Sequence, residues 1–416
     1  MKKRPAAELV TVGTELLTGS TVNTNAAYLG RELTQLGFKV AHQVACPDEK
    51  EAIYSALRDA LGRSDVIFVS GGLGPTPDDI TRECIAHYFG TPLVFSKEQF
   101  REISRHYRRR GKKVPESVKQ EAYFPAHARP VVNQFGIALG FIIEDHGRVV
   151  IVLPGVPGEL TRLFEFRLKR FLQKKFPDLR PAACLVVRTV GLSEPTIMRL
   201  LGRSFFKLGP FQFGIYPKAG EVAVRIYADS SSLIRRIKIH IEKALGPSIY
   251  SFSDEPLEGV IGARLKKKRQ TLSVAESCTG GKVAEKMTSV AGASAYFKGA
   301  VVSYGNDVKI KTLGIDPAVI KKSGAVSRAS AVAMARGIRE RMKTDYGLSV
   351  TGIAGPTGGS REKPVGLVYI GIADQNKVQV WEEHFGGDRE QIRTRAAKKA
   401  LEYLWRWIQE KKSGRF

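Results

Sequence analysis

Short apolar runs alternate with helical patterns along much of this chain, and this alternation limits the fold more than any other feature. Runs rich in strand-forming residues lie at 9–12, 38–41, 66–69 and later at 149–153, with residues at helical spacing between them. Strands that alternate with helices form a mostly parallel sheet covered by helices, and ligands bind at the carboxyl ends of its strands. We therefore predict a doubly wound α/β domain over residues 1–170.

The pattern then changes twice. Over residues 171–255 it reads strand, helix, two strands and helix, which predicts a small α+β domain. From 256 to 416 we expect a second α/β domain, with strands at 271–275, 296–304, 347–351 and 366–373. A chain of 416 residues agrees with several domains, because one hydrophobic core rarely organises so many residues.

The sequence shows few signals for a membrane span, for secretion, or for a zinc site or disulfide framework. No apolar run approaches the ~20 residues of a membrane-spanning helix, and the first residues do not resemble a secretory signal. The expected location is cytoplasmic, with no membrane partner. Cys46, Cys84, Cys184 and Cys278 form no C-x-x-C pair and have no histidines at zinc spacing, so we expect neither a structural zinc site nor a disulfide framework.

The net charge of +25 favours anionic partners, which include nucleic acid, an acidic membrane surface and phosphorylated metabolites. Charge alone does not choose among them. The densest basic stretch, Arg101 to Lys119, contains one aromatic residue and no nucleic-acid motif. We interpret it as a solvated helix face and loop.

A candidate nucleophile lies in the last domain, where Ala275-Glu276-Ser277-Cys278-Thr279-Gly280-Gly281 takes a strand into a sharp turn before a helix. Such a turn can expose a hydroxyl and direct backbone N–H groups at an oxyanion. Ser277 fits this description. A structural alternative is that Ser277 or Thr279 only caps the helix while the glycines permit the turn.

The base that would activate Ser277 is less obvious. His384 is the only histidine after His240, so a serine–lysine pair is simpler than a serine–histidine pair. The run 301–309 ends a strand with Tyr304, Asn306 and Lys309. A lysine there could be buried enough to lose its proton, although most lysines lie at the surface.

Two further loops could complete this site. A glycine-rich run begins at Thr351 and Gly352, and the polar run Gly386-Gly387-Asp388-Arg389 follows later. Together they could supply backbone donors and a guanidinium group for a phosphate. Neither run is specific alone.

Seven strings occur here in order over about residues 257–410: A-E-S-C-T-G-G, G-A-S-A-Y-F-K-G, V-V-S-Y-G-N, G-A-V-S, T-G-I-A-G-P-x-G-G, K-P-V-G and G-D-R. They resemble the CinA C-terminal family, whose members are similar to nicotinamide-nucleotide amidase. The resemblance implies hydrolysis of nicotinamide mononucleotide to nicotinate mononucleotide and ammonia. It also implies that Ser277 is the nucleophile, Lys309 its base and Tyr304 an assisting group.

The same resemblance implies that Thr351 and Arg389 position the substrate. We further expect Thr279, Gly280, Gly281, Asn306 and Gly352 to bind substrate, with no cofactor in this domain. Cys278 is a rival nucleophile, but it has no evident base. A cysteine beside such a turn is more often a small buried hydrophobic residue.

The N-terminal domain has its own candidate site. Glycines and then paired carboxylates follow the strand at 66–69, and further loops lie at 13–19 and 154–159. This pattern is plausible for a phosphate cradle beside a metal ion, although one aspartate should cap the next helix in any case. The predicted substrate-binding residues are Thr14, Asn25, Gly71, Gly72, Gly74 and Thr76, and the predicted metal ligands are Asp78, Asp79 and Glu159.

Over about residues 6–170, G-T-E-L-L-x-G, G-G-L-G-P-T-x-D-D-I-T, N-Q-F-G and L-P-G-V-P-G-E resemble the molybdopterin-binding-like domain of CinA proteins, and the middle segment is similar to their KH-like domain. In some relatives the first domain is an ADP-ribose pyrophosphatase that uses a divalent metal and potassium, and paired aspartates with Glu159 suit such chemistry. Ala138-Leu139-Gly140-Phe141 departs from the family's A-P-G-F. The middle segment lacks a G-x-x-G clamp, which argues against nucleic-acid binding there.

The expected protein is thus a cytoplasmic homodimer that acts on nicotinamide mononucleotide and ADP-ribose in pyridine-nucleotide salvage. Nucleic acid is not expected as a specific partner. The alternatives are a DNA-associated competence or damage factor, and an N-terminal domain that binds a pterin or nucleotide without catalysis. A DNA binder loses affinity steeply as salt rises, whereas amide hydrolysis needs no nucleic acid.

Overall fold

The computed structural model describes residues 4–181, 183–218 and 220–410, in two compact units that span 1–183 and 184–416. A six-stranded sheet in the order β2-β1-β3-β8-β7-β6 forms the centre of the first unit. Its strands are β1 (Ala6–Val12), β2 (Lys39–Cys46), β3 (Val66–Ser70), β6 (Arg129–Val131), β7 (Gly140–Asp145) and β8 (Arg148–Leu153). The first four strands in this order are parallel, and β7 runs antiparallel to its two neighbours, β8 and β6. The predicted mostly parallel sheet is confirmed.

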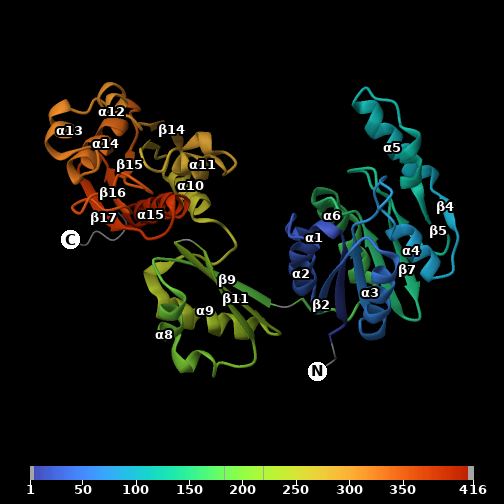
Figure 1. Ribbon diagram of the computed structural model, residues 1–416. Coiled ribbons are helices and arrows are strands. Elements are labelled where there is room, and N and C mark those ends of the chain that lie inside the picture. Colours follow the sequence, from blue (N-terminus) through green and yellow to red (C-terminus); the bar gives the residue numbers. More distant parts are fainter. Residues whose placement is uncertain (1–3, 182, 219, 411–416) are drawn as a thin grey trace. The chain divides into compact units, whose positions relative to one another are not determined.

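Helices cover both faces of this sheet (Figure 1). They are α1 (Thr14–Leu17), α2 (Thr24–Leu36), α3 (Lys50–Arg63), α4 (Thr81–Tyr88), α5 (Lys97–Arg109), α6 (Pro157–Leu163) and α7 (Lys169–Lys175), with short 3₁₀ and π segments at Glu116–Ala122 and Phe164–Leu168 and a two-stranded ribbon of β4 (Leu93–Phe95) and β5 (Tyr123–Pro125). Successive strand residues face opposite cores: Leu9 packs with α2 and α6, whereas Val10 packs with α3 and α4. The central strands β1, β3 and β8 are therefore buried on both faces, as their apolar runs predict, whereas the edge strand β2 is mostly exposed.

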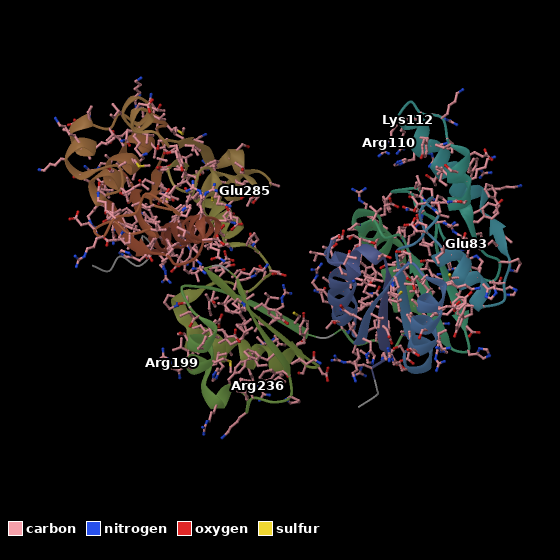
Figure 2. All side chains as sticks on the ribbon, in the orientation of Figure 1. Glu83, Arg110, Lys112, Arg199, Arg236 and Glu285 are labelled. Carbon is pink, nitrogen blue, oxygen red and sulfur yellow. The ribbon has the colours of Figure 1, made fainter. Side chains whose placement is uncertain are left out.

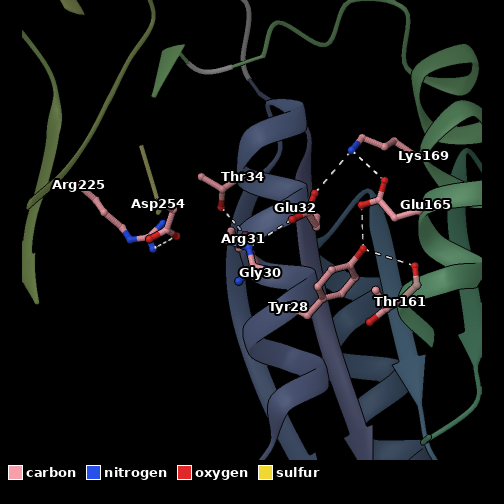
Figure 3. Close-up of polar contacts among 10 residues, drawn as sticks. All are labelled: Tyr28, Gly30, Arg31, Glu32, Thr34, Thr161, Glu165, Lys169, Arg225 and Asp254. Atoms are coloured by element: carbon pink, nitrogen blue, oxygen red, sulfur yellow. Dashed lines mark hydrogen bonds and ion pairs between the residues drawn. The ribbon is translucent and has the colours of Figure 1, made fainter. Parts of the chain in front are cut away.

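Polar contacts also link the helices on the α2 face. Tyr28 donates its hydroxyl hydrogen to Glu165 at 2.9 Å, and Lys169 pairs with Glu165 at 3.2 Å (Figure 3). Each of these partly exposed pairs contributes little to stability compared with the apolar core beneath it. The basic stretch lies elsewhere, on α5 and the loop after it, where Arg110 and Lys112 are exposed (Figure 2). The predicted solvated helix face is confirmed.

The second unit begins with a four-stranded sheet in the order β10-β11-β9-β12. Its elements are β9 (Ala183–Val190), α8 (Glu194–Phe205), β10 (Gln212–Lys218), β11 (Glu221–Ala228), α9 (Ser231–Leu245) and β12 (Ile249–Ser251). Both helices pack on this sheet around a core of its own. The predicted small α+β layout is confirmed. Asp254, in the segment after β12, pairs with Arg188. It also pairs with Arg225 (Figure 3).

A five-stranded sheet in the order β14-β13-β15-β16-β17 completes the second unit. Its strands are β13 (Leu272–Glu276), β14 (Phe297–Val302), β15 (Tyr346–Gly352), β16 (Leu367–Ala373) and β17 (Val378–His384). The helices are α10 (Leu257–Lys268), α11 (Lys282–Thr288), α12 (Asn306–Leu313), α13 (Pro317–Ser323), α14 (Arg328–Arg341) and α15 (Arg389–Glu410). Because β14, β13 and β15 are parallel neighbours, their carboxyl ends meet at one edge of the sheet.

Close packing of α14 on β15 depends on Gly347. A Cβ atom added there would lie 2.2 Å from the carbonyl oxygen of Ala335 and 2.7 Å from Cβ of Arg339. Real Cβ atoms do not approach backbone oxygen so closely, so any larger residue has to push the helix away from the sheet.

We expect Gly347→Ala to destabilise the C-terminal domain by about 1–3 kcal/mol, the usual cost of overpacking. The midpoint of urea unfolding, followed by tryptophan fluorescence, measures this directly because Trp381, Trp405 and Trp407 are the chain's three tryptophans and all belong to this domain. Gly386→Ala is the matched control, since its added Cβ meets nothing within 4 Å. Equal midpoints for both variants would contradict the packing argument.

Candidate active sites

Ser277 lies directly after β13, at the edge where the parallel strands of the C-terminal sheet end. Its N–H donates to the carbonyl oxygen of Val350 at 2.8 Å, which ties it to the end of β15. On the other side, the Ser303 N–H donates to the carbonyl oxygen of Glu276 at 2.8 Å. The serine is only 9% exposed, so its hydroxyl sits in a position fixed by three strand ends.

Lys309 reaches Ser277 from the first turn of α12, and the two residues form the centre of this site. Its Nζ lies 3.1 Å from Oγ of Ser277, 2.7 Å from the carbonyl oxygen of Ser303 and 3.1 Å from that of Tyr304. A neutral amine has two N–H groups and one lone pair. The two carbonyls can accept both hydrogens, and the lone pair is then left for the hydroxyl hydrogen of Ser277.

The surroundings of Lys309 favour this neutral form. The residue is 1% exposed, and burial lowers the pKa of its amine below the usual range for lysine. In the part of the chain that the structure describes, the hydrogen-bond partners of its amine are one hydroxyl and two backbone carbonyls, and none is a carboxylate. The positive end of α12 adds to the cost of a charge at this position. The serine and lysine that the sequence suggested as a pair therefore lie in a geometry that suits a general base and its nucleophile.

Tyr304 and Arg389 form the open side of the same site. Arg389 donates from one guanidinium nitrogen to the hydroxyl oxygen of Tyr304 at 2.8 Å and from another to the carbonyl oxygen of Gly355 at 2.6 Å. Tyr304 is 59% exposed, so its ring and the guanidinium can meet a ligand from solvent. Asn306, the first residue of α12, is also exposed.

Thr351 and Gly352, which were predicted to bind substrate, lie at the end of β15. Thr351 is fully buried and donates its hydroxyl hydrogen to the carbonyl oxygen of Ala325 at 2.9 Å. A Cβ on Gly352 would lie 2.6 Å from the carbonyl oxygen of Leu367 on β16. Both residues thus shape the strand end beside Ser277, and the hydroxyl of Thr351 is already engaged by the protein.

The turn after Ser277 is held by a residue that sequence reasoning missed. Gly280 and Gly281 have φ values of 58° and 95°, which favour glycine. The N–H of Gly280 donates to the carbonyl oxygen of Ser277, and that of Gly281 donates to the buried carboxylate of Glu276. Of the four N–H groups from Cys278 to Gly281, which we expected to stabilise an oxyanion, these two are therefore already used. One sequence feature could have revealed Glu276: it is a carboxylate at a strand position that is apolar in most buried strands.

Cys278 is buried among the apolar residues of the C-terminal core. Burial raises the pKa of its thiol to about 12. A thiol that keeps its proton is a poor nucleophile, so Cys278 does not compete with Ser277. The interpretation of this residue as a small buried hydrophobic side chain is confirmed.

We expect a charged disulfide reagent at pH 8 to modify Cys184 in the native protein much faster than Cys278, because Cys184 is exposed while Cys46, Cys84 and Cys278 are buried. Peptide mapping after a short exposure identifies the modified residues, and unfolded protein, in which all four thiols should react, is the control. Rapid modification of Cys278 would instead indicate an accessible thiolate beside Ser277.

In the N-terminal unit, a pocket of about 440 Å³ opens at the carboxyl ends of β1, β3 and β8. Of the residues predicted for this site, Asn25, Gly71, Gly72, Gly74, Asp78, Asp79 and Glu159 line it. Gly71 and Gly72 have φ values of 103° and 63°, and a Cβ on Gly71 would lie 2.1 Å from the carbonyl oxygen of Val12. The glycines therefore let the loop fold tightly against the end of β1.

Thr14 and Thr76 were predicted to bind substrate, but each is engaged by a neighbouring aspartate. The amide and hydroxyl of Thr14 donate to Asp48 at 2.8 and 3.0 Å. The amide of Thr76 donates to Asp79 at 3.0 Å, and its hydroxyl bonds to the same carboxylate. The threonines hold these aspartates at the pocket, and Asp48 is a lining residue that the sequence patterns did not indicate.

The predicted metal ligands share the pocket without forming a preformed metal site. Among the residues that the structure describes, no group of three or more histidine, cysteine or acidic side chains is arranged to hold a metal ion. Asp79 is bound to Thr76, and Glu159 accepts a hydrogen bond from Nδ2 of Asn133 at 2.5 Å. Burial raises the pKa of Glu159. Asp79 and Glu159 are therefore each held by a neighbouring side chain, and their role as metal ligands stays a prediction.

Two buried residues brace the pocket from behind. Arg82, at 1% exposure, donates to the carbonyl oxygen of Leu73 at 3.0 Å and thereby holds the glycine-rich loop. Ala138-Leu139 stands where the family has Ala-Pro. Ala138 lines the pocket, and Leu139 is buried in the protein. The leucine that replaces the family's proline thus points away from any ligand.

In the described chain, no helix has the length and apolar character needed to cross a bilayer.

These features define a multidomain α/β protein with a buried serine–lysine pair in one domain and a glycine-lined pocket in another. Residues 254–408 match the model of the CinA C-terminal domain, and residues 8–174 match that described as a probable molybdopterin binding domain. A CinA-like protein from Kosmotoga olearia is 39% identical over 406 residues, 96% of this chain and 98% of that protein. A relative from Moorella thermoacetica is 41% identical over 407 residues, with the same shares covered. The chain belongs to the CinA family.

Among solved structures, the protein CinA of unknown function from Thermoplasma acidophilum is 38% identical, covers 40% of this chain and 98% of its own, and has a TM-score of 0.38.

Proposed function

We propose that the C-terminal domain hydrolyses the carboxamide of nicotinamide mononucleotide to nicotinate mononucleotide and ammonia. One observation supports this most: Nζ of Lys309 lies 3.1 Å from Oγ of Ser277 in a buried site with two carbonyl acceptors and no paired carboxylate. This arrangement suits a neutral lysine acting as a general base for a serine nucleophile.

In the proposed reaction, Lys309 takes the hydroxyl proton as the serine oxygen attacks the carbonyl carbon of the amide. The C–N bond then breaks, and the protonated lysine returns the proton to the nitrogen, which leaves as ammonia. Water, activated by the same amine, hydrolyses the acyl-enzyme ester and releases the acid. No metal or organic cofactor takes part in these steps.

The proposed substrate contains a phosphate and a pyridine ring, and the open side of the site offers groups for both. The guanidinium of Arg389 suits a phosphate, and the exposed ring of Tyr304 suits a flat aromatic group. Bound beside Ser277, such a ligand would complete the enclosure of the reacting amide.

We expect Ser277→Ala to remove essentially all ammonia release from nicotinamide mononucleotide, and Lys309→Met to lower it nearly as much, because a serine without a base is a poor nucleophile. Cys278→Ala is the matched control and should keep a substantial part of the activity. A coupled ammonia assay on the full chain measures all three variants. Activity in Ser277→Ala together with its loss in Cys278→Ala would show that the thiol is the nucleophile.

Turnover should rise with pH, because the base acts only after it has lost its proton. Burial lowers the pKa of Lys309, so the midpoint of this rise should lie below the pKa of a free lysine. The dependence of kcat on pH, with unfolding monitored in parallel, tests this. A rate that is flat across the range, or that falls as pH rises, would contradict a neutral lysine base.

For the N-terminal pocket we propose binding of a second phosphorylated nucleotide, with ADP-ribose as the candidate substrate for hydrolysis of its diphosphate. The pocket's volume and its glycine-rich loops support this. Glu15, Asp48, Asp78, Asp79 and Glu159 all line it and would repel a diphosphate, so we expect binding to need accompanying cations such as a divalent metal and potassium. The alternative is a pocket that binds a pterin or nucleotide without catalysis.

Asp79→Ala should abolish release of ribose phosphate from ADP-ribose in the presence of divalent metal while amide hydrolysis stays near wild type, because the two sites lie in separate units. Asp145→Ala, which removes an aspartate of the same unit outside the pocket, is the control. Equal loss of both activities in Asp79→Ala would indicate unfolding or a shared site. Binding of ADP-ribose without any product would favour the non-catalytic alternative.

A further inference from the structure

The residue before the nucleophile, Glu276, carries a carboxylate that the proposed reaction does not use. It is the last residue of β13 and is 0% exposed. One carboxylate oxygen accepts the N–H groups of Gly281 at 3.0 Å and Val283 at 3.1 Å, and the other accepts that of Ala284 at 2.9 Å. Three N–H donors at the start of a helix compensate for burying this group.

These hydrogen bonds join the two ends of the turn that contains Ser277. The chain leaves β13 at Glu276 and enters α11 at Lys282, so one side chain ties the strand end to the beginning of the helix. The three bonds thereby keep the first residues of the helix close to the strand end, which limits the conformations open to the turn between them. Within the turn, the Gly280 N–H donates to the carbonyl oxygen of Ser277 at 3.1 Å.

Two amides of the turn remain available. In the described part of the chain, the N–H groups of Cys278 and Thr279 have no oxygen acceptor. The carbonyl oxygen of Thr279 is held separately by a guanidinium nitrogen of Arg393 at 3.0 Å, which fixes the peptide plane that follows. The N–H of the residue after a nucleophilic serine is a common donor to the oxyanion of acyl transfer.

We propose that Glu276 is a positioning residue of the amide-hydrolysing site, whose carboxylate holds the turn so that the N–H groups of Cys278 and Thr279 face the developing oxyanion. This inference rests on the proposed function of Ser277. It assigns Glu276 a part in the rate of acylation, through preorganised donors, in addition to its part in capping α11.

Glu276→Gln separates these roles because it keeps the size of the side chain. A glutamine has only one acceptor oxygen. Its NH₂ group would take the place of the other carboxylate oxygen and would face N–H groups that need an acceptor. We expect kcat for amide hydrolysis to fall about 10²-fold, the typical effect of a misplaced reacting geometry. KM should change by less than about twofold, and the pH midpoint should stay the same, since no contact of Lys309 is altered.

The control is Asp316→Asn, which weakens a carboxylate cap on α13 in the same domain, where Asp316 accepts the N–H of Ala318 at 2.8 Å. Its kcat should match wild type. If Glu276→Gln does not fold, Glu276→Asp retains the charge with a shorter reach and should give an intermediate loss of kcat.

A fluorophosphonate provides a second measurement that does not depend on the natural substrate. The Ser277 oxygen forms a bond to phosphorus, the P–F bond breaks, fluoride leaves, and the hydroxyl proton passes to Lys309. Mass spectrometry of the intact protein follows the adduct. We expect slower labelling in Glu276→Gln than in wild type, with the same final extent, and wild-type labelling in Asp316→Asn.

The outcomes separate the two proposals. The positioning role would be overturned if Glu276→Gln had the kcat and the labelling rate of wild type. It would also be overturned if the labelling rate were unchanged and only the final extent of labelling fell, because that result indicates only lost stability. If wild type releases no ammonia from nicotinamide mononucleotide but is labelled faster than Glu276→Gln, the substrate is wrong and the positioning role stands. If wild type is not labelled and releases no ammonia, both proposals fail.

Discussion

A buried amine without a charged partner is the feature on which the C-terminal site depends. Two carbonyl oxygens and one serine hydroxyl surround Nζ of Lys309, and none of them carries the negative charge that would favour an ammonium ion. Burial lowers the pKa of this amine, and the neutral form is what a general base requires. The strand ends, the turn after Ser277 and the first turn of α12 all serve to keep this amine beside the hydroxyl.

The two α/β domains build their sites in the same way, at the ends of parallel strands, but the charged groups around the two sites differ. In each, parallel strands end at one edge and glycines let a loop turn sharply there. The C-terminal site places one buried carboxylate, Glu276, on backbone donors and leaves the amine unpaired. The N-terminal pocket instead collects several carboxylates around an open volume, which favours ligands that bring cations.

Much of the C-terminal site could be predicted, because its chemistry is concentrated in short strings at strand ends. Ser277, Lys309 and the burial of Cys278 were expected, and the structure agrees with that geometry. Glu276 was missed because a buried glutamate has no periodicity that reveals which backbone groups it meets. Asp48 was missed for a similar reason, since its partner Thr14 lies 34 positions away in the chain.

By itself, the sequence determined the alternation of strands and helices, the glycine turns and the kinds of side chain available at each strand end. These follow from local patterns of apolar residues and from the backbone freedom of glycine. Only the tertiary structure decided which polar groups are free to act. The hydroxyls of Thr14, Thr76 and Thr351 are already bonded within the protein, whereas Oγ of Ser277 meets a buried amine. The pairing of β13 with β14 and the burial of α12 bring that amine and hydroxyl within 3.1 Å, and no local pattern encodes a distance between residues 32 positions apart.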